Sequence, residues 1–394
     1  MRLNRLSLTN FRAFSRLEMD LDGRILILVG DNAQGKTSLM EAVYYLATFA
    51  SFQAAVDRQM INFEAINEPL AVARIVGEYE RSGQTHRMEV RIIQEPVLPT
   101  GSRTRKEILL DGVKKSAAEA VGQFSAVIFL PQMTRIIEGS PDDRRKFLNM
   151  ALSQAVPGYA RVLSDYTRVI TRRNALLKML AEQHGQPDQL IYWDDQLIML
   201  GSEMVRARAN AVRQLEELAA RLHQRLTGGS ENLSIQYRPA IDLENLPDGN
   251  ITPESVEKSF RISLQHNRED EITRGVTLCG PHRDDLRFLC NGLDLGDFGS
   301  RGQVRTAMLS LKLAEVNWMK SMTGEWPVLL LDETLAELDL HRRADLQETL
   351  EVCDQGILTT TDLHQFTEKF MSECHVWRVT AGCVQVEEVP TAGV

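Results

Sequence analysis

The sequence predicts an α/β fold interrupted by a helical insertion. Short runs of Ile, Leu and Val, such as residues 25–29 and 126–130, are bounded by Gly or Pro and have the length of buried strands. Between about residues 140 and 268, apolar residues instead recur at steps of three and four, the spacing of amphipathic helices. We therefore expect an α/β body built from residues 1–139 and 269–394, with a helical arm at 140–268.

Composition narrows the class of protein. The 394 residues carry a formal net charge of −9, with 45 basic and 54 acidic side chains, which argues against coating nucleic acid by bulk charge. The longest apolar runs are about five residues, whereas a membrane span needs about 20. The five cysteines never occur as C-x-x-C. We expect a cytoplasmic protein with no membrane segment, disulfide framework or zinc-finger spacing.

The first part of the chain alternates between strand and helix patterns. Residues 3–14 alternate loosely between apolar and polar, as a partly exposed strand does. Residues 24–29 predict a buried strand, and residues 37–47 follow with helical spacing. Residues 70–112 contain several β-type runs separated by Gly and Pro turns, which predicts antiparallel hairpins. Residues 126–130 predict one more buried strand.

The helical insertion has clear start and stop signals. Ser140-Pro141-Asp142-Asp143 is typical of a helix start, with Ser at the cap, Pro at the first position and acids in the first turn. Pro157-Gly158 breaks this helix, a second runs from 159 to about 183, and a third from about 189 to 226. At 1.5 Å per residue the last would be about 57 Å long. We expect the two longer, antiparallel helices to form an arm.

The third part of the chain returns to α/β character. Residues 304–320 have the apolar spacing of a helix. Residues 326–331 and 356–360 are short apolar runs that predict two more buried strands.

A phosphate-binding loop follows the strand at 24–29. The segment matches G-x-x-x-x-G-K-[ST] at every fixed position and lies between a strand and a helix, as that motif requires. Backbone N–H groups of such a loop surround phosphate oxygens at the positive end of the helix. Lys36 would reach the β and γ phosphates of ATP, and the Thr37 hydroxyl would bind Mg²⁺. The predicted nucleotide-binding residues are Gly30, Asp31, Asn32, Ala33, Gln34, Gly35, Lys36 and Thr37.

Two adjacent carboxylates end the strand at 326–331. Asp332 would hold Mg²⁺, and Glu333 would orient or deprotonate the attacking water. An apolar strand followed by Asp-Glu is also common where a strand simply meets solvent. The 296 positions from Lys36 to Asp332 are too many for a small P-loop kinase or GTPase. They suit an ATPase head interrupted by an insertion.

Several further positions occur in the order found in ABC-type ATPases. Ser300 and Gly302 precede a helix, so Ser300 is either an ordinary helix cap or part of a second phosphate-binding helix end that contacts the γ-phosphate held by another protomer. Asp339 lies where such heads have a dimer-contact loop, and residues 359–362 where they have a switch residue. Gln132, just after the strand at 126–130, occupies the place of a glutamine that binds metal and water.

With these motifs in place, the chain resembles the RecF family of bacterial recombination-repair ATPases, which are related to the heads of SMC proteins. The resemblance covers nearly the whole length, and the string Gly280–Asp285 is especially typical of the family. The segments that carry it are 8–12, 30–37, 139–141, 144–148, 192–193, 280–286, 300–303, 331–332 and 337–339.

The resemblance implies an ABC-type P-loop ATPase head assembled from both chain ends, with an inserted helical arm as a second lobe. It implies a protein that binds ATP and Mg²⁺, dimerises with two nucleotides between the protomers, engages DNA and hydrolyses ATP slowly. Family members act in DNA replication, repair and the SOS response, with RecR and RecO, to help load the recombinase at single-strand gaps. Arg12 matches an N-terminal arginine that approaches the nucleotide.

A basic segment at the base of the arm is the predicted DNA contact. Residues 144–178 contain eight basic side chains and one acidic. On the count alone, a solvated helix face explains the segment equally well. The resemblance favours contact with DNA phosphates, and the predicted DNA-binding residues are Arg144, Arg145, Arg168, Arg172 and Arg173.

The chain departs from the family pattern at three places, and two other functions stay open. Gln132 follows Pro131 where an acidic residue is usual, Glu333 stands where Asp is frequent, and Val304 replaces a glutamine. These leave ATP binding intact but leave the role of Gln132 and the hydrolysis rate open. The first alternative is an ATP-gated structural DNA clamp with negligible hydrolysis. The second is a transporter-type ATPase subunit, against which the helical insertion and the Ser300-Arg301 sequence both argue.

Overall fold

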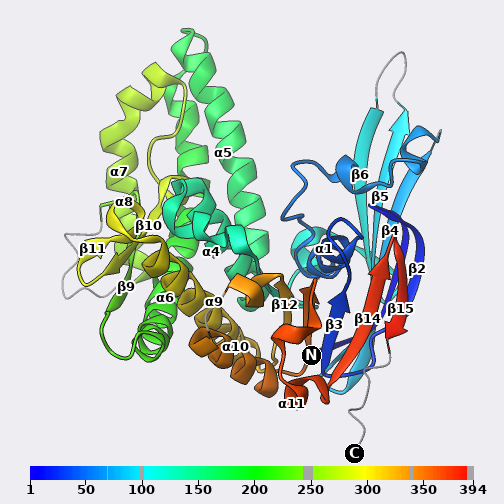
Figure 1. Ribbon diagram of the computed structural model, residues 1–394. Helices are drawn as coiled ribbons and strands as arrows, with labels where there is room; N and C mark the ends of the chain where they lie inside the picture. The colour runs from blue at the N-terminus through cyan, green and yellow to red at the C-terminus, as the bar shows by residue number, and fades with distance from the viewer. Residues whose placement is uncertain (69, 97–101, 243–251, 338–339, 388–394) are drawn as a thin grey trace, which may run out of the picture. The chain divides into compact units, whose positions relative to one another are not determined.

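The computed structural model describes residues 1–68, 70–96, 102–242, 252–337 and 340–387 (Figure 1). The chain divides into two compact units. The head unit comprises Met1–Met133 and Glu315–Val394, and the helical unit comprises Thr134–Ala314. The predicted boundaries, 139/140 and 268/269, are therefore corrected. The second moves furthest, because strand β10 (Asp285–Cys290) pairs with β9 (Leu233–Arg238) inside the helical unit.

The head unit contains an antiparallel sheet in the order β2-β1-β4-β5-β6-β7. Its first two strands confirm the alternating pattern near the N-terminus, and the others confirm the hairpins predicted at 70–112. The bounds are β1 (Arg2–Phe11), β2 (Phe14–Asp20), β4 (Ala71–Arg81), β5 (Gln84–Pro96), β6 (Ser102–Leu110) and β7 (Val113–Lys115).

The second sheet of the head unit positions the nucleotide-binding motifs. Its order is β15-β14-β3-β13-β12-β8, and every neighbouring pair is parallel except β14 with β15. The strands that are buried along their whole length were predicted as buried strands. The bounds are β3 (Ile25–Val29), β8 (Ala126–Phe129), β12 (Val328–Asp332), β13 (Gly356–Thr360), β14 (Cys374–Thr380) and β15 (Cys383–Glu387).

Helix α1 (Lys36–Thr48) contacts strands of both sheets and begins directly after the phosphate loop. Its apolar side chains, including Leu39, Val43 and Leu46, belong to a core cluster that also contains Leu26 and Val328. Burial of this face fixes the helix against the parallel sheet, so the N-terminus of α1 lies at the carboxyl end of β3. Carboxyl ends of parallel strands are where such sheets bind ligands.

The helical unit contains a bundle of three long helices rather than the two predicted. Helices α5 (Tyr159–Ala181) and α6 (Leu190–Leu226) pack together as expected, and α7 (Pro253–Arg274) packs against both of them (Figure 1). The sequence pattern missed α7 because its buried side chains form a narrow stripe, Val256, Phe260, Leu264 and Glu271, on an otherwise polar helix.

Helix α4 (Pro141–Ala155) begins as predicted: Ser140 Oγ accepts a hydrogen bond from the backbone N–H of Asp143 at 3.4 Å. A three-stranded sheet, β11-β10-β9, with β11 at Leu293–Asp294, completes the helical unit. Helix α9 (Arg301–Thr323) contains the predicted helix at 304–320. The remaining α-helices are α2 (Ala117–Ala120), α3 (Arg135–Glu138), α8 (Leu295–Phe298), α10 (Leu340–Val352) and α11 (Glu368–Met371). Within the described ranges, the helices are all too short or too polar to cross a bilayer.

Candidate nucleotide-binding site

The phosphate loop is held in shape by two glycines. Gly35 has φ 110°, a conformation that L side chains rarely adopt. A Cβ at Gly30 would lie 2.3 Å from the carbonyl oxygen of Val379, too close for any side chain. The far side of the loop is tied to the β14–β15 turn, because Gln34 Oε1 accepts a hydrogen bond from the N–H of Ala381 at 2.6 Å. The motif thus forms a fixed turn between β3 and α1.

Lys36 points back into this turn. Its ammonium group donates to the carbonyl oxygens of Gly30 at 2.6 Å and Asp31 at 2.9 Å. Its side chain is only 4% exposed, and the nearest carboxylate oxygen that it pairs with, Glu333 Oε1, is 3.6 Å away. The ammonium is therefore bonded mainly to neutral carbonyls, at the point where the loop surrounds a phosphate in proteins with this motif.

Asp332 and Thr37 meet although they are far apart in sequence. Thr37 Oγ1 donates to Asp332 Oδ1 at 3.2 Å, and the hydroxyl of Thr359 donates to the same oxygen at 2.7 Å. Burial raises the pKa of Asp332, and the two hydroxyl hydrogen bonds oppose that rise. A hydroxyl and a carboxylate held together at the phosphate loop are the hard oxygen donors that Mg²⁺ prefers.

Glu333 follows the strand in a strained conformation. Its φ is 50°, which non-glycine residues seldom adopt, and its N–H donates to Thr359 Oγ1 at 3.0 Å. Its side chain is 44% exposed. The carboxylate is thus presented to solvent beside Lys36, rather than packed under the sheet.

Thr359 supports both acidic residues, a role that the sequence analysis did not assign. The segment 359–362 was expected after the last strand as a switch. Thr359 instead lies inside β13, next to β12, and pairs in register with Asp332. The available signal was a run of threonines at the end of a predicted parallel strand, opposite the Asp-Glu pair.

Gln132 and Arg12 lie at different edges of the same unit. Gln132 is exposed in a short 3-10 helix, η3 (Pro131–Thr134), just after β8, the parallel neighbour of the strand that ends in Asp332. Arg12 is held by Glu41 of α1, with Nε and Nη2 donating to the two carboxylate oxygens at 2.7 and 2.8 Å. Their contacts with nucleotide stay predictions.

Ser300 and Gly302 form an exposed helix start in the helical unit. Ser300 Oγ accepts from the N–H of Gln303 at 3.2 Å, while Gln303 Oε1 accepts from the N–H of Ser300 at 3.1 Å. Ser300 is therefore a helix cap, one of the two roles considered. A Cβ at Gly302 would meet only Ser300 Oγ, at 4.0 Å, so the first turn is open to approach. Asp339 lies outside the described residues.

The basic segment separates into buried and exposed arginines, and the DNA-binding prediction for Arg173 is wrong. The Arg173 side chain is 0% exposed and forms ion pairs with Asp194 at 2.8 Å and Glu271 at 2.7 Å. A guanidinium enclosed by two carboxylates cannot also reach a DNA phosphate. Arg144 and Arg145 are only 12% and 20% exposed, with Arg144 paired to Asp285 at 2.6 Å.

Arg168 and Arg172 remain accessible on α5. Arg168 is 62% exposed and pairs with Asp165 on its own helix. The Arg172 guanidinium carbon lies 5.8 Å from the ring centroid of Trp193. The two arginines, with Trp193 and the exposed Tyr192, line a surface cavity of about 270 Å³. This is the part of the basic segment that offers charge to a partner.

The phosphate loop, the Thr37–Asp332 pair and the interrupted α/β head define a class, the nucleotide-binding heads of RecF, RecN and SMC proteins. The family model described as "RecF/RecN/SMC N terminal domain" matches residues 2–384. The DNA replication and repair protein RecF of Roseiflexus castenholzii is 38% identical over 97% of this chain and 99% of its own length, and that of Enterococcus faecalis is 35% identical over 98% and 99%. The chain belongs to the RecF family.

Solved structures agree. Those of the recombination mediator protein RecF of the RecFOR pathway, with ATP and with ATPrS, superpose with a TM-score of 0.81 at 27% identity, covering 98% of both chains. An SMC head bound to the C-terminal winged-helix domain of ScpA gives a TM-score of 0.51 at 14% identity, over 100% of this chain and 98% of that one. That second likeness concerns the fold alone. The expectations of a RecF family member and an ABC-type head are confirmed.

Proposed function

We propose that this protein binds ATP with Mg²⁺, dimerises on DNA, helps load the recombinase at single-strand gaps and hydrolyses ATP slowly. The observation that carries the proposal is the convergence of Lys36, Thr37, Asp332 and Glu333 at one edge of the parallel sheet. The RecF structures solved with ATP support the choice of nucleotide. The family resemblance supports RecR- and RecO-type partners.

Each side chain of the site has a distinct part in this proposal. Lys36 would exchange its two carbonyl contacts for phosphate oxygens, and the loop N–H groups would bind the remaining charge. Thr37 and Asp332 would hold Mg²⁺, which neutralises phosphate charge when bound. The exposed Glu333 carboxylate would accept a proton from, or orient, the attacking water.

Phosphate release by the Glu333→Gln variant tests the catalytic part. The amide keeps the shape of the side chain but is a poor proton acceptor, so we expect release to fall about 100-fold or more while ATP affinity is retained. Hydrolysis by the variant at the parent rate would contradict the role of Glu333. If the parent protein dimerises with ATP but releases no phosphate with DNA present, the ATP-gated clamp is the better description.

The helix start at Ser300 is proposed to complete the nucleotide site of a second protomer. Its first turn is exposed, it carries the positive end of a 23-residue helix, and Gly302 adds no side chain. Ser300→Arg should therefore block ATP-driven dimerisation and leave the ATP affinity of the single protomer almost unchanged, as measured by sizing and nucleotide titration. Loss of protomer ATP affinity as severe as that of Lys36→Met would assign Ser300 to the same-chain site instead.

A further inference from the structure

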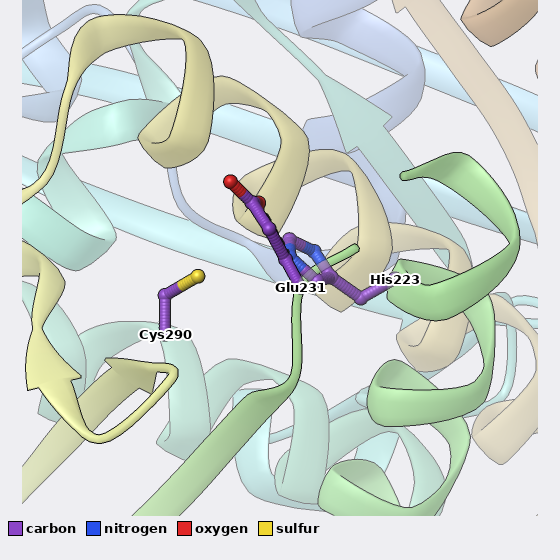
Figure 2. Close-up of side chains that lie close together, drawn as sticks. All are labelled: His223, Glu231 and Cys290. Atoms are coloured by element: carbon purple, nitrogen blue, oxygen red, sulfur yellow. Dashed lines mark hydrogen bonds and ion pairs between the residues drawn. The ribbon is translucent and has the colours of Figure 1, made fainter. Parts of the chain in front are cut away.

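Three potential ligand side chains meet in the helical unit, away from the phosphate loop in sequence. His223 lies near the end of α6, Glu231 in the loop before β9, and Cys290 at the end of β10. One nitrogen, one oxygen and one sulfur of these residues lie within 4.8 Å of one another. Figure 2 shows the Cys290 sulfur directed toward Glu231 and His223. His223 and Cys290 are 0% and 4% exposed.

The hydrogen bonds around His223 define which ring nitrogen carries the proton. The hydroxyl of Ser310 donates to the carbonyl oxygen of Thr306 at 2.8 Å, so its proton is already used. Its oxygen therefore accepts from His223 Nδ1, 3.1 Å away. In a neutral imidazole with the proton on Nδ1, Nε2 is a lone pair, and it faces the carboxylate oxygen Glu231 Oε2 at 3.2 Å.

Two acceptors at hydrogen-bond distance need a cation between them. That cation is either a proton, which would make His223 an imidazolium, or a metal ion. A proton uses only His223 and Glu231. A metal ion also accounts for the buried sulfur of Cys290, which points into the same space.

We propose that His223, Glu231 and Cys290 form a zinc-binding site. Nitrogen, oxygen and sulfur donors together suit Zn²⁺, whereas Mg²⁺ and Ca²⁺ prefer oxygen alone. Three protein ligands leave a fourth position for water. In a tetrahedral zinc site the ligand atoms are about 3.5 Å apart, so the metal would draw this cluster together by small side-chain rotations.

The surroundings of the cluster resemble the outer shell of a metal site. Ser310 orients His223 through Nδ1, and Gln303 Nε2 donates to Glu231 Oε1 at 3.0 Å. Gln303 is also the residue that caps Ser300 at the start of α9. Bound zinc would therefore fix the end of α6, the loop before β9 and the end of β10 against the first turn of α9. This inference is independent of the proposed function.

Metal binding to the full chain, stripped with a chelator and then titrated with Zn²⁺ or Co²⁺, tests the proposal. We expect one tightly bound ion per chain, an intense thiolate-to-Co²⁺ absorption band, and a higher unfolding temperature with Zn²⁺. Cys290→Ser should lose the band and weaken the affinity at least about tenfold. Cys279→Ser, at a site of similar burial, and Cys383→Ser, at an exposed site, should behave like the parent.

Two further variants keep the outcome decisive. If Cys290→Ser fails to fold, Glu231→Gln should still show the loss of affinity, because that carboxylate is 21% exposed and replaceable. Lys36→Met should bind zinc normally whether or not ATP binding is lost, which separates this site from the nucleotide site. Absence of the thiolate band in the parent, or equal metal affinity in Cys290→Ser, would overturn the proposal and leave an imidazolium–carboxylate pair.

Discussion

Lys36 in the head unit and Arg173 in the helical unit are both buried cations, and their surroundings are opposite. Lys36 is bonded to two neutral carbonyls, with a single carboxylate oxygen 3.6 Å away. Arg173 is enclosed by the carboxylates of Asp194 and Glu271. Partial charges can be exchanged for a phosphate, whereas a pair of formal charges already satisfies the guanidinium. The comparison shows that the compensation of a buried cation, rather than its burial, decides whether it can bind a ligand.

Replacing Arg173 is expected to have the largest effect on folding. Arg173→Met leaves two buried carboxylates without their partner, which typically costs about 3–5 kcal/mol in the free energy of unfolding. Hydrogen exchange measured by mass spectrometry should show the loss in α5, α6 and α7. The matched control is Arg172→Met on the same helix, which faces Trp193 and should change stability little. Equal stability of the two variants would contradict the comparison.

Acid should destabilise the helical unit through His282, because its interior is arranged around a neutral imidazole. Tyr166 Oη donates to His282 Nδ1 at 2.9 Å, and His282 Nε2 donates to the carbonyl oxygen of Thr277 at 3.1 Å. Burial, with the nearby charge of Arg283, lowers the pKa of His282 to about 4, although the bond to Thr277 opposes the shift. The unfolded chain, with a pKa of about 6.5, takes up the proton first.

The sign of this pH dependence follows from the lowered pKa. The stabilising contribution is complete above about pH 6.5 and is lost as the pH falls toward about 4, for a total of about 3 kcal/mol. Urea unfolding at a series of pH values measures it. His282→Gln, which keeps hydrogen-bonding capacity without titrating, should have a flatter profile. A parent profile equally flat over this range would show that the imidazole is not held neutral.

Replacing Lys36 should have the reverse signature of Arg173. Lys36→Met removes the cation that the phosphate loop offers to ATP, so we expect about a 100-fold loss of ATP affinity, near 2.7 kcal/mol. The free energy of unfolding should change by less than about 1 kcal/mol, because only hydrogen bonds to carbonyls are lost. Nucleotide titration and urea unfolding of the same preparation provide both values. A large loss of stability with intact ATP binding would reverse the comparison.

Local motifs explain why so much of the head unit was predictable. The phosphate loop specifies its own conformation through Gly30 and Gly35, and the strands on either side were evident from apolar runs. The partnership of Lys36 with Asp332 followed from chemistry, since a phosphate site needs a metal ligand on a nearby strand. The hydroxyl of Thr359 was not assigned, because its contact with Asp332 depends on which strand neighbours β12.

The helical unit was less predictable because its charges are compensated across long sequence distances. Arg173 was assigned to DNA because only Asp165 is acidic within the basic segment. Its partner Glu271 lies on α7, a helix whose narrow apolar stripe was not recognised. The boundary near residue 268 failed for a related reason, since the pairing of β9 with β10 joins segments on either side of α7.

The smallest expected effect concerns the two arginines that remain accessible, Arg168 and Arg172. Both lie on α5, where a phosphate could approach without breaking a buried ion pair. Replacing both by Gln should weaken DNA binding about tenfold and make the salt dependence shallower by up to about 1.8 in log–log slope, because two fewer counterions are released. Fluorescence anisotropy with gapped DNA at several salt concentrations measures both quantities. Arg213→Gln is a suitable control, because Arg213 on α6 is 64% exposed and also paired along its own helix. If the double variant and this control had the same affinity and slope, the segment would be a solvated helix face. A loss of affinity with an unchanged slope would instead point to the aromatic side chains of the surface, beginning with Trp193, as the source of the binding energy.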